Sequence, residues 1–458
     1  MKELCILSPT AILGYGFPEA SFEEAMRMNP DVIAVDAGST DPGPYYLGAG
    51  ISFTDRNAVK RDLSFMIPAA LKAKIPVIIG TAGGSGAKPH LDWQVEIIEE
   101  IAKEKGLHFN MAVIAADVSQ EEVLNKLADG KITPLFPAPQ LTEQDIKNSV
   151  QIVGQMGAEP VITALEQGAD VIVAGRAYDP SVFAALAIKE GYDRGLATHL
   201  GKILECAAIA ATPGSGSDCM IGFLGKDYFR VDTLSSARKC TVKSVAAHTL
   251  YEKTNPYILP GPGGILDLTN TVFTQETESA VKVTGSVFKP SVTNYIKLEG
   301  VRSAGFRTVS ICATADPVMM SQIDDIIVAV KERVKSNFAG SIGEFALDFK
   351  VYGKNGVAGI FEAGGFPQMN PGSKPHEFCI IIDALAPTQS QANTVCSFAR
   401  STLLHYGYEG RISTAGNLAF PFSPSDFKVG EVYEFSIYHL MEADPEEHFK
   451  VEIRRCGQ

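Results

Sequence analysis

Short apolar runs and longer amphipathic stretches alternate along the first half of the chain. Runs of strand length, rich in Val and Ile, occur at Leu4–Leu7, Val32–Val35, Val77–Ile79, Met111–Ile114 and Val171–Val173. Stretches with helical periodicity lie between them, at Ala58–Lys74, Trp93–Lys105, Gln120–Asp129 and Val161–Gln167. Continuous apolar strands separated by helices are typical of a parallel sheet with helices on both faces. The pattern therefore predicts an N-terminal α/β domain with three layers.

The pattern changes near residue 225. From Tyr228 to Val309 the chain is rich in strand-like segments and in the turn-forming residues Gly and Pro. Two strand–helix–strand segments follow, one from Arg307 to Tyr352 and one from Glu377 to Tyr438. This order predicts a C-terminal α+β domain with ferredoxin-like βαβ units. Because 458 residues exceed what one core usually supports, we expect two domains, residues 1–225 and 226–458, packed against each other.

Composition and charge narrow the class of protein. The formal net charge is -13, and the acidic residues are scattered along the chain. Nucleic-acid binding needs clustered Lys and Arg, so this composition argues against it. No apolar run approaches the roughly 18 residues of a membrane span, and no basic segment followed by an apolar one opens the chain. The eight cysteines stand singly, which is typical of reduced core thiols. We expect a cytoplasmic protein that forms a homo-oligomer.

Small and polar residues follow four of the predicted strands. The segments are Asp36–Gly48, Gly80–His90, the stretch around Asp117, and Ala174–Phe183. Open parallel sheets bind ligands just beyond the carboxyl ends of their strands. We therefore expect these segments to line one cleft.

The second of these segments is rich in glycine. Thr81, Gly83, Gly84, Ser85 and Gly86 follow a predicted buried strand. Glycines allow successive backbone N–H groups to converge on an anion, so the segment is a candidate cradle for a carboxylate or phosphate. An ordinary tight turn is the alternative. The order of residues does not match the phosphate-binding loop or the dinucleotide fingerprint, so no nicotinamide or flavin cofactor is indicated.

Two carboxylates and an imidazole are candidates for acid/base chemistry. Asp36 and Asp179 each come just after a predicted buried strand, and His90 follows the glycine-rich segment. A carboxylate in a partly desolvated cleft can act as an acid or a base, or can bind a divalent metal. The alternatives are a turn cap at Asp36, a helix cap at Asp179 before Pro180, and a structural role for His90 at a helix start.

Arg176 is the candidate anion binder of the fourth segment. A guanidinium among small residues at a sheet edge suits two-point recognition of a carboxylate or phosphate. The alternative is a salt bridge between the two domains. Ser39, Thr40 and Tyr178 stand in the same predicted loops and complete the expected substrate-binding set.

Ser215 and Cys219 offer a different kind of chemistry. Both lie in the small-residue segment Ala211–Gly222, and either is a candidate nucleophile for a hydrolase or an acyl transferase. The order Gly214-Ser215-Gly216-Ser217-Asp218 does not match the nucleophile elbow G-x-S-x-G. The pattern therefore disfavours a covalent hydrolase.

Five segments together resemble a known family. DVIAVDAGSTDPG, AGRAYDPSVFAA, AAHTLYEKTNPY, GPGGILDL and NLAFPFSPSDF are similar to the acyclic terpene utilisation family, formerly a domain of unknown function. The resemblance extends from about Asp31 to about His439. It implies a role in the catabolism of carboxylic acids or acyl-CoA intermediates, including branched terpenoid acids.

These observations favour a lyase of the hydratase or dehydratase type. Its substrate would be a small carboxylate or an acyl thioester, held by the glycine-rich segment and Arg176. Asp36, Asp179 and His90 would supply the acid and the base. Two alternatives stay open: a hydrolase or acyl transferase using Ser215 or Cys219, and a non-catalytic subunit that binds a ligand or a partner.

Overall fold

The computed structural model describes residues 2–251, 254–354, 356–357 and 375–457. The chain divides into two compact units. Unit 1 comprises Met1–Arg302 with Phe435–Gln458, and unit 2 comprises Ser303–Glu434. Two long strands, β15 (Tyr295–Thr314) and β18 (Asp426–Glu442), contribute residues to both units.

This division differs from the predicted boundary near residue 225. That position lies between β8 (Met220–Leu224) and β9 (Phe229–Thr233), which pair antiparallel with Leu224 opposite Phe229. Paired strands share one sheet and one core, so the chain on both sides of residue 225 belongs to unit 1. Unit 1 instead ends within β15, next to a shift in strand register between Val301 and Arg302.

A ten-stranded mixed sheet forms the centre of unit 1. Its order is β12-β13-β9-β8-β1-β2-β3-β7-β4-β19. The five apolar runs of the sequence form the parallel middle of this sheet, and antiparallel strands extend it on both sides. The bounds not yet given are β1 (Leu4–Ser8), β2 (Val32–Asp36), β3 (Val77–Gly80), β7 (Val171–Ala174), β4 (Phe109–Ile114), β12 (Val272–Gln275), β13 (Val281–Thr284) and β19 (Val451–Cys456).

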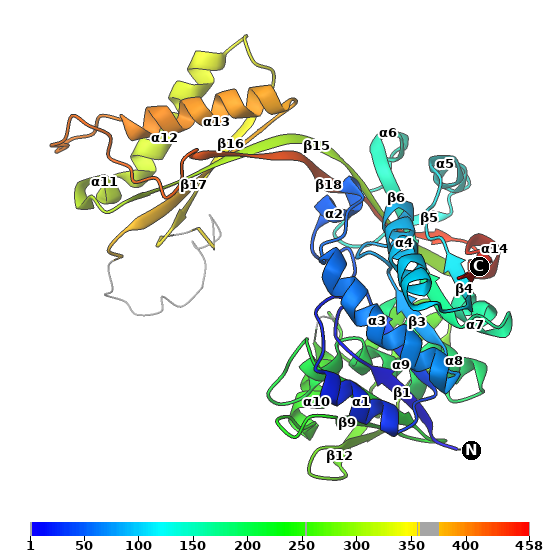
Figure 1. The fold of residues 1–458 in the computed structure, drawn as a ribbon. Coiled ribbons are helices and arrows are strands. Elements are labelled where there is room, and N and C mark those ends of the chain that lie inside the picture. The colour runs from blue at the N-terminus through cyan, green and yellow to red at the C-terminus, as the bar shows by residue number, and fades with distance from the viewer. Residues whose placement is uncertain (1, 252–253, 355, 358–374, 458) are drawn as a thin grey trace. The chain divides into compact units, whose positions relative to one another are not determined.

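Helices cover both faces of the parallel middle (Figure 1). One face packs against α1 (Glu19–Arg27), α3 (Arg56–Ala73) and α4 (Lys88–Lys105), and the other against α7 (Glu159–Glu166), α8 (Asp179–Lys189) and α9 (Arg194–Leu204). The strand residues are buried on both faces, which explains why the runs are continuously apolar. The predicted three-layer arrangement around parallel strands is therefore present, within a larger mixed sheet.

Shorter elements complete unit 1. They are α2 (Pro44–Ala49), α5 (Gln120–Ala128), α6 (Glu143–Asn148), η1 (Ala207–Ala210), α10 (Val242–Leu250), α14 (Pro445–His448), β5 (Ile132–Pro134), β6 (Ser149–Gln155) and the sheet of β10 (Ile258–Gly261), β11 (Gly264–Asp267) and β14 (Val287–Pro290). β6 pairs with the first part of β15, and β5 pairs with the last part of β18.

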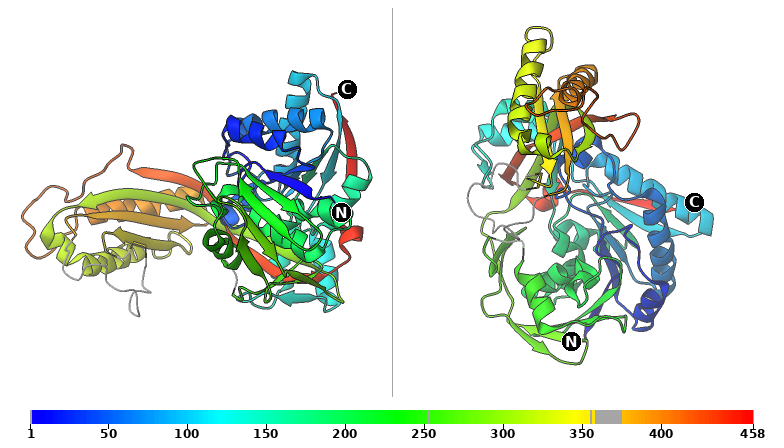
Figure 2. Two further views of the ribbon diagram at one scale, coloured as in Figure 1. Left: turned by 90° about the horizontal axis from the view of Figure 1, so that it is seen from below. Right: turned by 90° about the vertical axis from the view of Figure 1, so that its left-hand side faces the viewer.

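Unit 2 is built on an antiparallel sheet with the strand order β16-β17-β15-β18. Its further elements are α11 (Pro317–Ser321), α12 (Ile323–Phe338), β16 (Ala346–Tyr352), β17 (Phe378–Ala386) and α13 (Gln389–Leu404). α12 and α13 lie side by side on one face of this sheet (Figures 1 and 2). Both strand–helix–strand segments expected from the sequence are present. In the part of the chain that the structure describes, no helix has the length and apolarity needed to cross a membrane.

Candidate functional site

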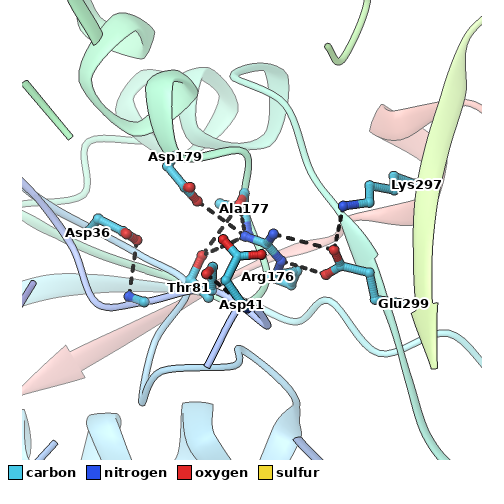
Figure 3. A network of polar contacts seen from close by, with 10 residues as sticks. Asp36, Asp41, Thr81, Arg176, Ala177, Asp179, Lys297 and Glu299 are labelled. Carbon is cyan, nitrogen blue, oxygen red and sulfur yellow. Dashed lines mark hydrogen bonds and ion pairs between the residues drawn. The ribbon is translucent and has the colours of Figure 1, made fainter. Parts of the chain in front are cut away.

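Arg176 lies at the centre of a buried polar network at the carboxyl end of the parallel strands (Figure 3). Only 3% of its surface is exposed. Its Nε donates to Glu299 Oε2 at 2.7 Å, and its Nη1 donates to the Ala177 carbonyl at 2.7 Å and to Asp179 Oδ1 at 3.2 Å. The guanidinium is therefore held between two carboxylates of the protein itself.

Strand pairing brings Glu299 to Arg176, although 123 residues separate them. Glu299 lies on β15 opposite Val153 of β6. At the end of β6, Met156 forms a parallel bridge with Ala177 and accepts a hydrogen bond from the N–H of Tyr178. β6 thus connects the strand that carries Glu299 to the segment that carries Arg176.

A second cation completes the environment of Glu299. Lys297 Nζ lies 2.6 Å from Glu299 Oε1, the oxygen that also accepts a hydrogen bond from Arg176 Nη2 at 3.5 Å (Figure 3). Burial would raise the pKa of the Glu299 carboxyl, but Arg176 and Lys297 outweigh this effect and lower it to about 2. Glu299 is therefore ionised at any physiological pH, and it neutralises much of the charge of Arg176.

Asp36 and Asp179 form an electrostatically coupled pair beside Arg176. Asp36 is the last residue of β2, and Asp179 is the first residue of α8. Burial raises the pKa of Asp36 well above 3.8, and the charge of Asp179 raises it further, against the N–H of Gly38 and the charge of Arg176. Burial also raises the pKa of Asp179; Arg176 opposes this rise, and the nearby charge of Asp41 adds to it. The negative charge of Asp179 therefore makes ionisation of Asp36 less favourable.

Thr81 adopts a strained backbone conformation next to Arg176. Its φ angle is +47°, which is uncommon for any residue other than glycine and rarer still for a β-branched one. Its hydroxyl accepts a hydrogen bond from the N–H of Ala177 at 3.2 Å, and Arg176 Nη1 lies 3.5 Å from it. Strain of this kind persists where the surroundings enforce it and is enriched at functional sites.

The glycines of the candidate cradle pack closely against neighbouring chain segments. A Cβ at Gly86 would lie 2.2 Å from the backbone N of Arg176, and one at Gly83 would lie 2.6 Å from the His90 carbonyl. A Cβ at Gly84 would meet the ring of Phe53 at 2.8 Å. The N–H groups of Gly84 and Gly86 donate to carbonyls within the same segment. The observed contacts therefore give these glycines a packing role, and the anion cradle stays a prediction.

Ser85 and His90 are buried near this segment. The Ser85 hydroxyl has no hydrogen-bond partner among the described residues. His90 lies within α4, because that helix begins at Lys88, earlier than the helical stretch from Trp93 that the sequence predicted. Pro89 fits the first turn of the helix. His90 Nε2 lies 3.0 Å from the Tyr46 carbonyl and 3.2 Å from the Ile51 carbonyl, and burial lowers its pKa. These contacts correspond to the structural role of a neutral imidazole.

Thr40, Ser39 and Tyr178 occupy different surroundings. Thr40 is buried and lines a pocket of about 500 Å³ together with Asp41 and Glu299. Ser39 accepts a hydrogen bond from the N–H of Asp41. Tyr178 lies against Gly261, away from that pocket, and its phenol pKa is raised by burial and by Glu205 and Asp179.

Neither alternative nucleophile has the surroundings of an activated group. Burial raises the pKa of the Cys219 thiol, which disfavours the reactive thiolate. The hydroxyl of Ser215 accepts a hydrogen bond from the N–H of Ser217. Within residues 2–251, 254–354, 356–357 and 375–457, no histidine or carboxylate hydrogen-bonds to Ser215. The geometry therefore gives no support to a serine or cysteine nucleophile.

The sequence did not predict three members of the network as site residues: Asp41, Lys297 and Glu299. Lys297 and Glu299 alternate along a strand, and opposite charges two residues apart are typical of a solvent-exposed strand face. Only the pairing of β15 with β6 reveals that Glu299 is buried.

A three-ligand metal site is not formed by the described residues. No group of three or more His, Cys, Asp and Glu side chains among them is placed to hold a metal ion. The divalent metal considered for Asp36 and Asp179 from the sequence stays a prediction.

Fold and site together define an α/β protein with a buried arginine network at the carboxyl ends of the parallel strands of a mixed sheet. The profile of the acyclic terpene utilisation family protein AtuA matches residues 55–218 and 234–420. The chain therefore belongs to the acyclic terpene utilisation family, as the sequence segments predicted. The family name implies a role in acyclic terpene utilisation, which is consistent with catabolism. No curated protein and no solved structure matches the chain.

Proposed function

We propose that this protein is a catabolic enzyme, a lyase of the hydratase or dehydratase type, acting on a small carboxylate or an acyl thioester. The observation that carries the proposal is the pair Asp36 and Asp179, whose pKa values are both raised by burial at the carboxyl edge of the parallel strands. Water elimination needs one group that accepts a proton and one that donates it, both near neutral pH. A carboxyl pair in which one member is ionised and the other is protonated would supply both.

During dehydration of a 3-hydroxyacyl group, one of the two carboxyls of Asp36 and Asp179 would act as the base and the other as the acid. The ionised carboxylate removes the proton from the carbon next to the carbonyl. The protonated carboxyl gives its proton to the departing hydroxyl, which leaves as water while the carbon–carbon double bond forms. One proton stays on the pair throughout, so hydration uses the same pair with exchanged roles.

Arg176 would act as a positioning residue in this scheme. Its Nη1 holds Asp179 Oδ1 at 3.2 Å, and its charge lowers the cost of ionising one member of the pair. Because Glu299 occupies its Nε, we assign Arg176 no direct contact with the substrate.

A second candidate function is a non-catalytic subunit that binds a ligand or a partner. The saturation of Arg176 by Glu299, Asp179 and the Ala177 carbonyl favours it, because this network also has the form of a structural ion-pair cluster. The two candidates differ in whether the carboxyl pair moves protons.

The test is an assay of water transfer. The protein is incubated with a panel of 3-hydroxyacyl and 2-enoyl thioesters and the matching free acids, and products are read by mass spectrometry as gain or loss of one water. We expect turnover of at least one pair, and a fall of about 10²–10⁴-fold in Asp36→Asn and in Asp179→Asn. Turnover unchanged in both variants would refute the assignment of the pair.

We extend the proposal to the rest of the chain in three respects. Unit 2 has the strand order and helix placement of a ferredoxin-like arrangement, which its β15–α12–β16 and β17–α13–β18 segments support. A cytoplasmic location and assembly into a homo-oligomer stay predictions from the sequence.

A further inference from the structure

A pocket of about 500 Å³ in unit 1 borders the Arg176 network. At one end it is lined by Thr40, Asp41 and Glu299. Thr40 and Asp41 follow Asp36 in the same loop, and Glu299 is the carboxylate that holds Arg176. The pocket therefore shares Glu299 with the network, and the charge of Asp41 in its lining acts on Asp179.

The body of the pocket is apolar. The loop after β5 and the unit 1 part of β18 supply its main side chains: Pro137, Pro139, Leu141, Phe435, Ile437 and Tyr438. Ligand pockets of this size and character are common in proteins, with a few polar groups fixing the orientation of the ligand.

Three polar side chains of the body, those of His439, Ser436 and Arg302, are already engaged with the protein. His439 Nε2 lies 3.0 Å from the Pro139 carbonyl, and Ser436 Oγ lies 2.7 Å from Ser149 Oγ. Arg302 donates to Asp145 at 2.9 Å. The body thus suits an uncharged, apolar chain.

The end next to the network is acidic. Asp41 is a carboxylate there, and Glu299 is ionised because Arg176 and Lys297 lower its pKa. Both of these cations are directed at Glu299, at 2.7 and 2.6 Å. A ligand carboxylate placed here would lose its hydration beside two carboxylates of the protein, and the nearby cations are already paired. An uncharged carbonyl group avoids this repulsion.

We propose that this pocket binds the chain of the substrate, and that the substrate enters as an uncharged acyl derivative, a thioester, ester or amide, rather than as a free acid. The inference rests on the proposed function in one respect: it takes the reacting end to lie at Thr40 and Asp41, towards Asp36 and Asp179. The inference favours the acyl thioester over the free carboxylate, the two substrate classes that the sequence left open.

The test compares two probes that differ in charge alone. Octanamide and octanoate have chains of equal length and head groups of similar shape, and their binding at neutral pH is measured by titration calorimetry. We expect octanamide to bind at least about tenfold more tightly. Equal affinities, or tighter binding of octanoate, would overturn the inference.

A pair of variants on one loop locates the binding. Ala138 lines the pocket, whereas Phe136 is 95% exposed and does not. Ala138→Trp should weaken octanamide binding at least about tenfold by filling the pocket, and Phe136→Trp should leave it within about twofold. Octanamide affinity that is unchanged in Ala138→Trp, or lost equally in both, would place the ligand elsewhere and overturn the inference.

The binding readout separates this inference from the proposed reaction. Octanamide binding that passes both tests supports the pocket even where no thioester is turned over, and that result counts against the reaction alone. Turnover of a free acid with no turnover of its thioester supports the reaction and overturns the inference.

Discussion

Arg176 and Glu299 form a buried ion pair in which Nε and Oε2 are 2.7 Å apart, with 3% and 1% of the two side chains exposed. The pair joins the segment after β7 to β15. Arg176 Nε is engaged by Glu299, whereas Nη1 donates a hydrogen bond to Asp179. The salt-bridge alternative for Arg176 is therefore present, but within unit 1 rather than between domains.

Arg176→Lys should destabilise the protein. Lysine has one nitrogen and cannot reach Glu299, Asp179 and the Ala177 carbonyl together, and each lost hydrogen bond to a charged group costs roughly 1.5–3 kcal/mol. Thermal unfolding should show a Tm lower by several degrees. The control is Arg302→Lys, at a pair in which Arg302 is 34% exposed, which should change stability by at most about 1 kcal/mol. Equal Tm shifts in the two variants would contradict this account.

Glu299→Gln should change how stability depends on acid. The native pKa of Glu299 is lowered from 4.5 to about 2 by Arg176 and Lys297, against the effect of burial. Its contribution to stability is therefore fully present above 4.5 and is lost as the pH falls towards 2. At neutral pH the variant leaves Arg176 without this partner, which costs about 3–5 kcal/mol. Urea unfolding should show that the difference in free energy of unfolding between the native protein and the variant becomes smaller below pH 4.5. A difference that does not change with pH would contradict the lowered pKa of Glu299.

For Asp36→Asn we expect the opposite dependence of stability on pH. Burial raises the pKa of Asp36 in the native state, so the unfolded chain releases this proton first, near the ordinary value of 3.8. Between that value and the native pKa the folded state binds more protons, and stability falls as the pH rises. Asparagine does not ionise, so the variant does not lose this stability as the pH rises. Urea unfolding at several pH values should show the variant gaining stability relative to the native protein as the pH rises, whereas a relative loss would contradict the raised pKa.

Gly86→Ala should displace Arg176. Gly86 has a φ of +73°, and an added Cβ would lie 2.2 Å from the Arg176 backbone N. Gly130 provides the control, because its φ is +69° and nothing lies within 4 Å of an added Cβ. Gly130→Ala should cost only the backbone term of about 1–2 kcal/mol. Thermal unfolding should show a clearly larger loss of stability for Gly86→Ala than for Gly130→Ala. Equal losses of stability would contradict the close packing of Gly86 against Arg176.

The parallel middle of the sheet was predictable because local patterns determine it. Buried parallel strands are apolar on both faces, so the runs at Val32–Val35 and Val77–Ile79 were recognisable without knowledge of their partners. The shared carboxyl edge of parallel strands indicated that Thr81, Arg176 and Asp179 lie close together, and the structure shows contacts of Arg176 with the other two. The cleft expected to include Asp36, Ser39 and Ser85 as well stays a prediction.

The rest depends on pairings between distant segments. Glu299 is buried only because β15 pairs with β6, and no local pattern indicates that contact. The unit boundary falls inside β15, which pairs with β6 before its register shift and with β17 after it. A change of composition near residue 225 could not reveal a boundary that lies within one continuous strand.

The central claim is that Asp36 and Asp179 share a proton as a coupled pair. The most direct measurement is a pH titration of the aspartate carboxyl carbons by ¹³C NMR, with Asp36→Asn and Asp179→Asn identifying the two signals. We predict two linked steps displaced upward from the ordinary value of 3.8, and a shift of each step towards that value when the other residue is replaced. Two independent steps near 3.8, unchanged by replacement of the partner, would contradict the account.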